Sequence, residues 1–415
     1  MKNMLLNVNG SSRDINDRYF YRDIHENIGN LYISRSVAKI FGLNSNNTKF
    51  INSIISADPD AFRYYLNALE EVDTIFLILE DHLRESFPDQ WYDTAFNYIR
   101  EIDPTTQKLV VLSLAANSHA PWADPYDADL AFRLSKSKLN FFKMLSDRSK
   151  VIGVRGDYEV EQLNKIQIHN TKALGCPSYF EEGRNRIVST PEWSANDGRI
   201  IGVTGQLGYF IDSDAHFYLQ GDYDWPIVEV IYGEPKSLTS QWQESIAQAP
   251  RLSLLRGLVT ERVHFFPDFC AWKDHVRKNC KAVIGTRLHG AIIALNAGVP
   301  AIVTNGDTRC RSSCAFLGIP WQPGEPINST RSGIQKLFGE IDIAAVNDIY
   351  QRRFSDFCDW AQEMSLPLAF KETDLSPISM QNKRPPDIVV QSFVKILRGN
   401  IRYNDGNDII LAPHY

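Results

Sequence analysis

The chain has 415 residues, of which 43% are hydrophobic and 23% charged, and its formal net charge is −6. This length exceeds what one hydrophobic core usually serves, so two domains are expected. The acidic balance argues against a non-specific nucleic-acid binder, which needs a surplus of Lys and Arg, but it allows a local cationic pocket.

Apolar runs of strand length alternate with segments of helical spacing along most of the chain. This alternation predicts an α/β fold with parallel sheets, arranged as two Rossmann-like doubly wound domains. The predicted strands are 5–8, 74–79, 109–114, 151–154, 200–203, 227–231, 282–284 and 301–303. Predicted helices include 31–41, 130–145, 269–280 and 343–364.

The first residues, MKNMLLNVNG, contain an apolar run that is too short for a secretory signal. No stretch approaches the ~20 apolar residues of a transmembrane helix. We therefore expect a cytoplasmic protein, and peripheral attachment at the inner face of a membrane stays open.

A polar, Gly- and Pro-containing stretch at 183–199 is the best domain boundary. We expect an N-terminal domain at 1–190, on the acceptor side, and a C-terminal domain at 191–415, on the donor side. Two such domains facing each other would place the active site in a cleft at the carboxyl ends of their strands. Whether the weakly patterned segment from 373 onward returns to the first domain stays open.

Six cysteines are too few for a disulfide scaffold in a chain of this size. Cys310 and Cys314 are close in sequence, but a structural zinc site needs two such pairs and no second pair exists. We therefore expect no metal.

The strongest local signal is KAVIGTRLHGAIIALNAGVPAIV, residues 281–303. A buried strand leads into a turn that carries Arg287 and His289, and a short helix is predicted at 291–296. A helix start favours an anion, and Arg287 adds a bidentate clamp for phosphate or carboxylate. Taken alone, such a pair is most often a capping or surface feature.

The flanking segments change that interpretation. Asp268 and Trp272 precede the strand, and NGDTRCRSSCAFLGIP (305–320) follows the helix. Earlier segments are VIGVRGDYEVEQL (151–163), ALGCPSYF (173–180) and ENIGNLYISRSV (26–37). Together these segments resemble the polysaccharide pyruvyl transferase family over about residues 20–320. One departure is the early loop, which often ends in Asp in that family and reads Gly29-Asn30 here.

The resemblance implies a GT-B-like fold and an enzyme that uses phosphoenolpyruvate as co-substrate, with no cofactor. Such enzymes join pyruvate as a ketal across two hydroxyls of a sugar in a surface polysaccharide, such as an exopolysaccharide, and release phosphate. By this resemblance His289 is the general acid/base, with Arg287 and Arg155 on the donor. Arg309 and Gly290 are further donor-binding candidates. Arg155 can also be interpreted as a surface salt-bridge residue, paired with Asp157 or Glu159.

Acceptor-binding candidates are amide and imidazole side chains at two predicted strand exits. They are Asn27, Gly29 and Asn30 in the early loop, with Asn117 and His119 after strand 109–114. All five can equally be ordinary turn residues, and the same holds for Glu80, Asp81 and His82. The acceptor is a saccharide, lipid-linked or free.

Two other functions stay open. A glycosyltransferase of the same fold would use a nucleotide-sugar donor, since fold does not settle function. A non-catalytic relative would bind carbohydrate only. Titration with phosphoenolpyruvate against nucleotide sugars distinguishes a pyruvyl transferase from the glycosyltransferase. Phosphate release distinguishes it from the non-catalytic relative.

Overall fold

A computed structural model describes most of the chain. The described residues are 2–6, 28–51, 59–118, 129–193, 201–205, 215–220, 262–266, 268–304, 306–322, 328, 330–371, 401–403 and 409–411. Two parallel six-stranded sheets with helices confirm the α/β prediction. The predicted strand at 227–231 lies outside the described residues.

The first sheet has the strand order β2-β1-β3-β4-β5-β6, and all its pairs are parallel. Its strands are β1 (Asn3–Leu6), β2 (Thr48–Ile51), β3 (Thr74–Ile78), β4 (Lys108–Leu114), β5 (Ser149–Val154) and β6 (Thr171–Ala173). The chain moves one way from β1 to β2 and the other way from β3 to β6. Right-handed crossovers therefore place helices on both faces, and both faces are apolar: Leu77 and Phe76 pack into different core clusters.

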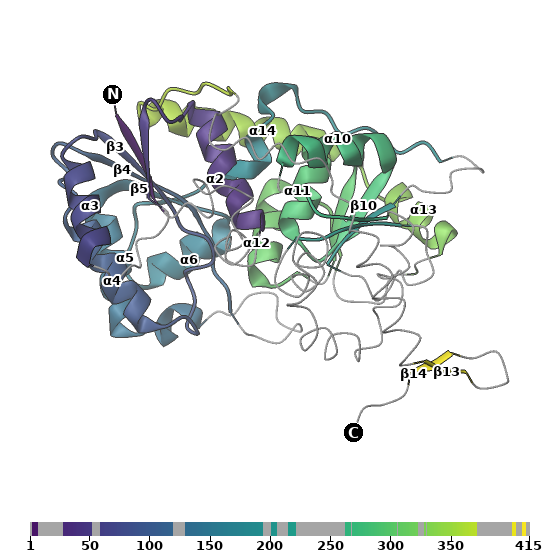
Figure 1. The fold of residues 1–415 in the computed structure, drawn as a ribbon, viewed down its shortest axis with the longest axis horizontal. Helices are drawn as coiled ribbons and strands as arrows, with labels where there is room; N and C mark the ends of the chain where they lie inside the picture. The colour runs from purple at the N-terminus through teal and green to yellow at the C-terminus, as the bar shows by residue number, and fades with distance from the viewer. Residues whose placement is uncertain are drawn as a thin grey trace.

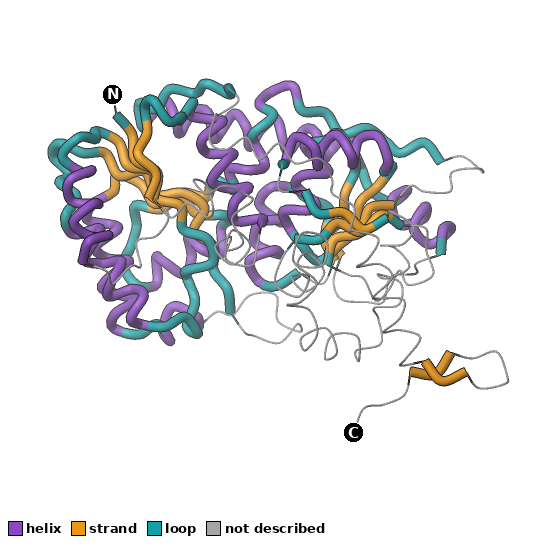
Figure 2. Tube along the Cα trace, in the orientation of Figure 1, coloured by secondary structure: helices purple, strands orange, loops and turns teal. Residues whose placement is uncertain are grey.

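The second sheet has the order β12-β11-β10-β7-β8-β9, also parallel throughout. Its strands are β7 (Ile201–Thr204), β8 (His216–Tyr218), β9 (Val263–His264), β10 (Ala282–Gly285), β11 (Ala301–Thr304) and β12 (Trp321–Gln322). The winding direction reverses between β7 and β10. A third, two-stranded antiparallel sheet joins β13 (Ile401–Tyr403) to β14 (Ile409–Leu411) and lies apart from both (Figure 2).

Three helices fill the space between the two parallel sheets: α2 (Ile28–Phe41), α11 (Leu288–Asn296) and α12 (Thr308–Leu317) (Figure 1). One core cluster runs through this layer, from Leu5 of the first sheet through Leu31 to Ile284 of the second. The other helical segments are α3 (Pro59–Leu69), α4 (Asp89–Arg100), η1 (Leu130–Arg133), α5 (Lys136–Arg148), α6 (Asp157–Lys165), η2 (Pro177–Phe180), η3 (Gly183–Asn185), α10 (Phe269–Asn279), α13 (Arg331–Gly339) and α14 (Ile343–Glu363).

After the second sheet the chain returns to the first one through α14. Lys108 Nζ donates to the Met364 carbonyl at 2.8 Å, and the Ala369 amide donates to the Ile40 carbonyl at 2.7 Å. The segment that returns to the first sheet thus precedes residue 373. The segment from 373 onward, for which the sequence leaves a return open, lies outside the described residues apart from β13 and β14.

The predicted helix at 130–145 is in fact two elements, η1 and α5. Ser135 caps α5 by accepting a hydrogen bond from the Lys138 amide, which is why the helix starts anew there. Among the described helices, none combines the length and the apolar character needed to cross a bilayer.

Candidate functional site

The candidate site lies where each sheet reverses its winding direction. In the second sheet the reversal falls between β7 and β10, and the Thr286 amide, just beyond β10, donates to the Thr204 carbonyl at 2.9 Å. In the first sheet it falls between β1 and β3, with Glu80 and Asp81 just beyond β3. Ligands of doubly wound sheets bind at the carboxyl ends of strands beside such reversals.

Helix α11 begins at Leu288, three residues earlier than the sequence predicted. The earlier start is a correction for His289, which lies in the first helical turn and not in the turn before the helix. Leu288 is buried in the core, and Gly290 lets the turn pack against Thr204, because a Cβ there would lie 2.5 Å from Thr204 Cγ2. Arg287 is the extended N-cap residue of the helix.

His289 is 6% exposed and touches both halves of the molecule. From the first half, the backbone of Gly29 approaches the ring so closely that a Cβ would collide with Nδ1 of His289. From the connecting segment, Cys176 Sγ lies 3.6 Å from His289 Nε2. Glycine at position 29 is therefore required by the close approach of α2 to α11.

Arg155 follows β5 and is 1% exposed, so it is not a surface residue. Its Nε donates to both the carbonyl and the Oγ of Ser113, each at 3.1 Å. Ser113 has a φ of 66°, in the left-handed region that a residue other than glycine adopts at a cost. Ser113 Oγ in turn lies 4.0 Å from Cys176 Sγ. Arg155 and His289, far apart in sequence, are thus linked through Ser113 and Cys176.

The electrostatic environment of His289 is cationic. Burial lowers the pKa of His289 well below its usual value, and Arg155, Arg309 and Arg287 lower it further. The imidazole is therefore neutral at neutral pH, and an anion brought to this place would be attracted.

Arg309, on α12, bridges the two halves. Its guanidinium lies 2.9 Å from Asp307 and 3.3 Å from Asp81, which follows β3 of the first sheet. Burial opposes ionisation of the Asp81 carboxyl, but Arg309 and Arg84 outweigh it and hold the pKa of Asp81 below its usual range.

Two of the predicted acceptor residues that the structure describes contact carboxylates. Asn30 Nδ2 donates to Glu80, and Asn117 Nδ2 lies 3.4 Å from Asp81 Oδ2. Gly29 contacts His289, as described above. Asn27 and His119 lie outside the described residues.

Sequence reasoning missed Glu159, which it treated only as a partner for Arg155. Glu159 is fully buried, accepts from the Ala116 amide at 3.0 Å and from Ser312 Oγ at 2.6 Å, and so joins α6 to α12. Burial raises the pKa of Glu159 to about 7, although both hydrogen bonds lower it. No periodicity signals this residue; only its place four residues after Arg155 could have drawn attention to it.

His82 and the two cysteines of α12 are buried side chains that pack inside the fold. His82 stacks on Trp91 with ring centroids 4.2 Å apart, and burial lowers the pKa of His82 to about 4. Cys310 and Cys314 are buried on α12, and burial raises the pKa of both thiols.

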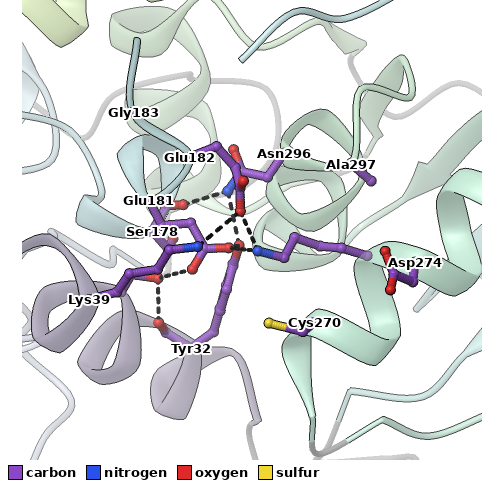
Figure 3. Close-up of polar contacts among 12 residues, drawn as sticks. Tyr32, Lys39, Ser178, Glu181, Glu182, Gly183, Cys270, Asp274, Asn296 and Ala297 are labelled. Carbon is purple, nitrogen blue, oxygen red and sulfur yellow. Dashed lines mark hydrogen bonds and ion pairs between the residues drawn. The ribbon is translucent and has the colours of Figure 1, made fainter. Parts of the chain in front are cut away.

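A second polar cluster lies at the other end of α11 (Figure 3). Asn296 Nδ2 donates to the Tyr32 hydroxyl at 2.9 Å, and that hydroxyl donates to Glu181 Oε1 at 2.5 Å. Lys273 Nζ, from α10, pairs with Glu181 at 2.6 Å and also with Glu182. Burial would lower the pKa of Lys273, but the two carboxylates outweigh burial and raise it.

Among solved structures the chain is similar to HepE of Anabaena in complex with UDP, at 12% identity and a TM-score of 0.43, covering 88% of this chain and 100% of that one. It is also similar to a glycosyltransferase from Rickettsia africae, at 12% identity and a TM-score of 0.39, covering 95% and 97%. A third is the UDP-GlcNAc 2-epimerase of Neisseria meningitidis bound to UDP-GlcNAc, at 9% identity and a TM-score of 0.38, covering 96% and 100%. Likenesses at this level say nothing about the donor that this chain uses.

No curated protein matches the chain. The model of the polysaccharide pyruvyl transferase family matches residues 27–308, from the start of α2 to the start of α12. This match spans more than half of the chain and includes Arg155, Arg287 and His289. The chain therefore belongs to the polysaccharide pyruvyl transferase family.

Proposed function

We propose that this protein transfers the enolpyruvyl group of phosphoenolpyruvate to two hydroxyls of a sugar, forming a pyruvate ketal and releasing phosphate. The observation that carries the proposal is the place of His289 beside Arg287 at the start of α11, with Arg155 linked to the imidazole through Ser113 and Cys176. A small, multiply anionic donor requires such a concentration of cations, and its chemistry requires a proton carrier nearby.

Arg309 pairs with Asp81 and Asp307, so its charge is largely balanced. We assign the donor phosphate and carboxylate to Arg287, the N-cap residue of α11, and to Arg155, which directly follows β5 of the first sheet. The planar guanidinium suits two-point binding of both anionic groups.

His289 performs the proton transfer in this proposal. It is neutral in the free protein, and an anionic donor beside it raises its pKa, so donor binding is accompanied by proton uptake. The imidazolium then protonates the methylene carbon of the donor, and one sugar hydroxyl attacks the resulting oxocarbenium-like centre and returns its proton to His289. Cleavage of the bond between the central carbon and the phosphate oxygen releases phosphate, and the second hydroxyl attacks the same carbon, closes the ketal and gives its proton to the departing phosphate.

The acceptor sugar is assigned to the side of the first sheet. Asn30 and Asn117 there contact Glu80 and Asp81, and such amide and carboxylate groups suit sugar hydroxyls. The acceptor is a saccharide unit of a surface polysaccharide, and a lipid-linked unit would bring the protein to a membrane surface.

The test is a thermal-shift titration with phosphoenolpyruvate against a panel of nucleotide sugars, followed by measurement of phosphate release with candidate acceptors. We expect stabilisation by phosphoenolpyruvate and release of phosphate only when acceptor is present. Arg287→Lys should lose donor-dependent stabilisation although it keeps the charge, because the two-point contact is lost.

Two results would replace the proposal. Stabilisation by a nucleotide sugar and not by phosphoenolpyruvate indicates a glycosyltransferase. Donor binding without phosphate release in the presence of any pyruvylatable sugar indicates a binding protein.

A further inference from the structure

Three histidines converge on one face of the second sheet, and none of them belongs to the candidate site. His216 opens β8, His264 ends β9, and His275 lies on α10. Tyr218 pairs with His264 in the parallel register, and since side chains alternate along a strand, His216 and Tyr218 share a face. Helix α10 covers this face, with the His264 and His275 ring centroids 4.1 Å apart.

The ring nitrogens of these residues are close enough for one shared ion. His216 Nδ1 lies 2.9 Å from His264 Nε2, and one nitrogen from each of the three rings lies within 4.8 Å of the others. Nitrogens bound to a tetrahedral zinc ion at about 2.1 Å are about 3.4 Å apart. We infer that His216, His264 and His275 bind a zinc-type divalent transition-metal ion between β8, β9 and α10.

The Tyr218 hydroxyl acts as a positioning group for this site. It lies 2.9 Å from His275 Nδ1, which leaves Nε2 of that ring for the ion, and 3.2 Å from Cys280 Sγ. Metal-binding histidines usually have their other ring nitrogen held by such a partner, which fixes the tautomer and the direction of the lone pair.

The type of ligand agrees with this ion. The group that converges here consists of imidazoles. Imidazole favours zinc, copper, nickel or cobalt, whereas calcium and magnesium favour oxygen ligands.

The effect that follows from these three contacts is on stability. His216 and His264 are 48 positions apart in sequence, so an ion would close that loop and fix both ends to α10. Closing a long loop limits the unfolded chain and thereby stabilises the folded one. No local pattern in the sequence predicts this site, because its ligands come from three separate segments, and the expectation of no metal rests on the cysteines.

The test uses the full chain, freed of metal by a chelator and titrated with zinc chloride by calorimetry. We expect one ion per chain, a rise in melting temperature with zinc, and visible absorption typical of low coordination number when cobalt replaces zinc. His275→Gln should weaken zinc binding at least 100-fold, since this half-buried side chain can be exchanged without opening the core. Tyr218→Phe should weaken it about 10- to 100-fold.

The matched control is His169→Gln, the same exchange at an exposed histidine that contacts Asn164, and it should bind zinc as the unaltered protein does. Zinc binding that His275→Gln leaves unchanged would overturn the inference, and so would the absence of any zinc-dependent rise in melting temperature. Neither readout uses phosphoenolpyruvate, so the result is independent of the proposed function.

Discussion

Helix α11 carries a polar cluster at each end, and the two clusters differ in how their charges are balanced. At its start, three arginines lower the pKa of His289. At its end, beside Asn296, two glutamates raise the pKa of Lys273. In the second cluster a buried cation is paired with anions, which a permanent contact between buried segments requires. The first gathers cations around a neutral imidazole, which suits a place that an anion visits.

The largest effect should come from the cationic end. His289→Gln removes the proposed proton carrier, so turnover should fall about 10²- to 10⁴-fold. Donor binding and the melting temperature should change little, because the arginines and the volume of the side chain remain. Steady-state phosphate release measures turnover, and a titration with phosphoenolpyruvate measures donor binding. Turnover within a few-fold of the unaltered protein, with His169→Gln as the reference, would remove His289 from the mechanism.

The balanced end should respond in stability. Lys273→Met removes the cation that pairs with buried Glu181 and leaves the partly exposed Glu182 with Lys39 alone, which should cost about 3–5 kcal/mol of unfolding free energy. Chemical denaturation measures this loss. Lys278→Met, on the exposed side of the same helix, is the control and should lie within about 0.5 kcal/mol of the unaltered protein. Equal losses of unfolding free energy in Lys273→Met and Lys278→Met would contradict a stabilising role of the Lys273 ion pairs.

Glu159, which accepts a hydrogen bond from Ser312 of α12, gives a test of the cationic end through the pH dependence of stability. Its pKa in the folded protein is about 7, above its ordinary value of 4.5. The folded state therefore holds the proton more tightly, and stability should fall as the pH rises from about 4.5 to 7, by about 3 kcal/mol in total. Glu159→Gln can keep both hydrogen bonds and should remove this fall, making the variant the more stable protein at pH 8.

Denaturation at pH 5 and pH 8 measures this pH dependence. Glu161→Gln, the same exchange on the exposed face of α6, should keep the pH dependence of the unaltered protein. If Glu159→Gln keeps it too, another group titrates in this range and Glu159 is ionised in the fold.

The smallest effect concerns the rim of the balanced cluster. Lys39 lies 3.4 Å from Glu182, at a partly exposed position. Such pairs contribute about 0–1 kcal/mol, so Lys39→Met should destabilise the protein far less than Lys273→Met. A loss of unfolding free energy comparable to that of Lys273→Met would show that the Lys39–Glu182 pair contributes as much to stability as the Lys273 pairs do.

Much of the fold follows from local sequence patterns. The predicted strands at 74–79, 109–114 and 282–284 coincide closely with β3, β4 and β10, because buried parallel strands read as short, continuous apolar runs. The sequence predicts the start of α11 too late, because its N-cap residue Arg287 and the first-turn residues His289 and Gly290 resemble a loop. Only the packing of Leu288 and Thr204 extends the helix there.

The candidate site can be predicted from the sequence only in part, because some of its residues are brought together by strand ends and others only by tertiary packing. Arg155, Arg287 and His289 stand at strand ends that any doubly wound sheet brings to one edge. The contacts of Asp81 with Arg309, and of Glu159 with Ser312, depend on how α12 meets the first sheet. That meeting is a property of tertiary packing, which no local pattern encodes.

The return of α14 to the first sheet has a consequence for the order in which the nascent chain can fold. The ring of Phe41, at the end of α2, lies 6.3 Å from that of Phe357, and the backbone of Ile40 receives the segment after α14. During translation the first half therefore exposes this apolar end until roughly 330 further residues have been made, about 20–60 s at ordinary ribosomal rates. The N-terminal half thus leaves the ribosome unfinished, and chaperone binding is expected at the end of α2.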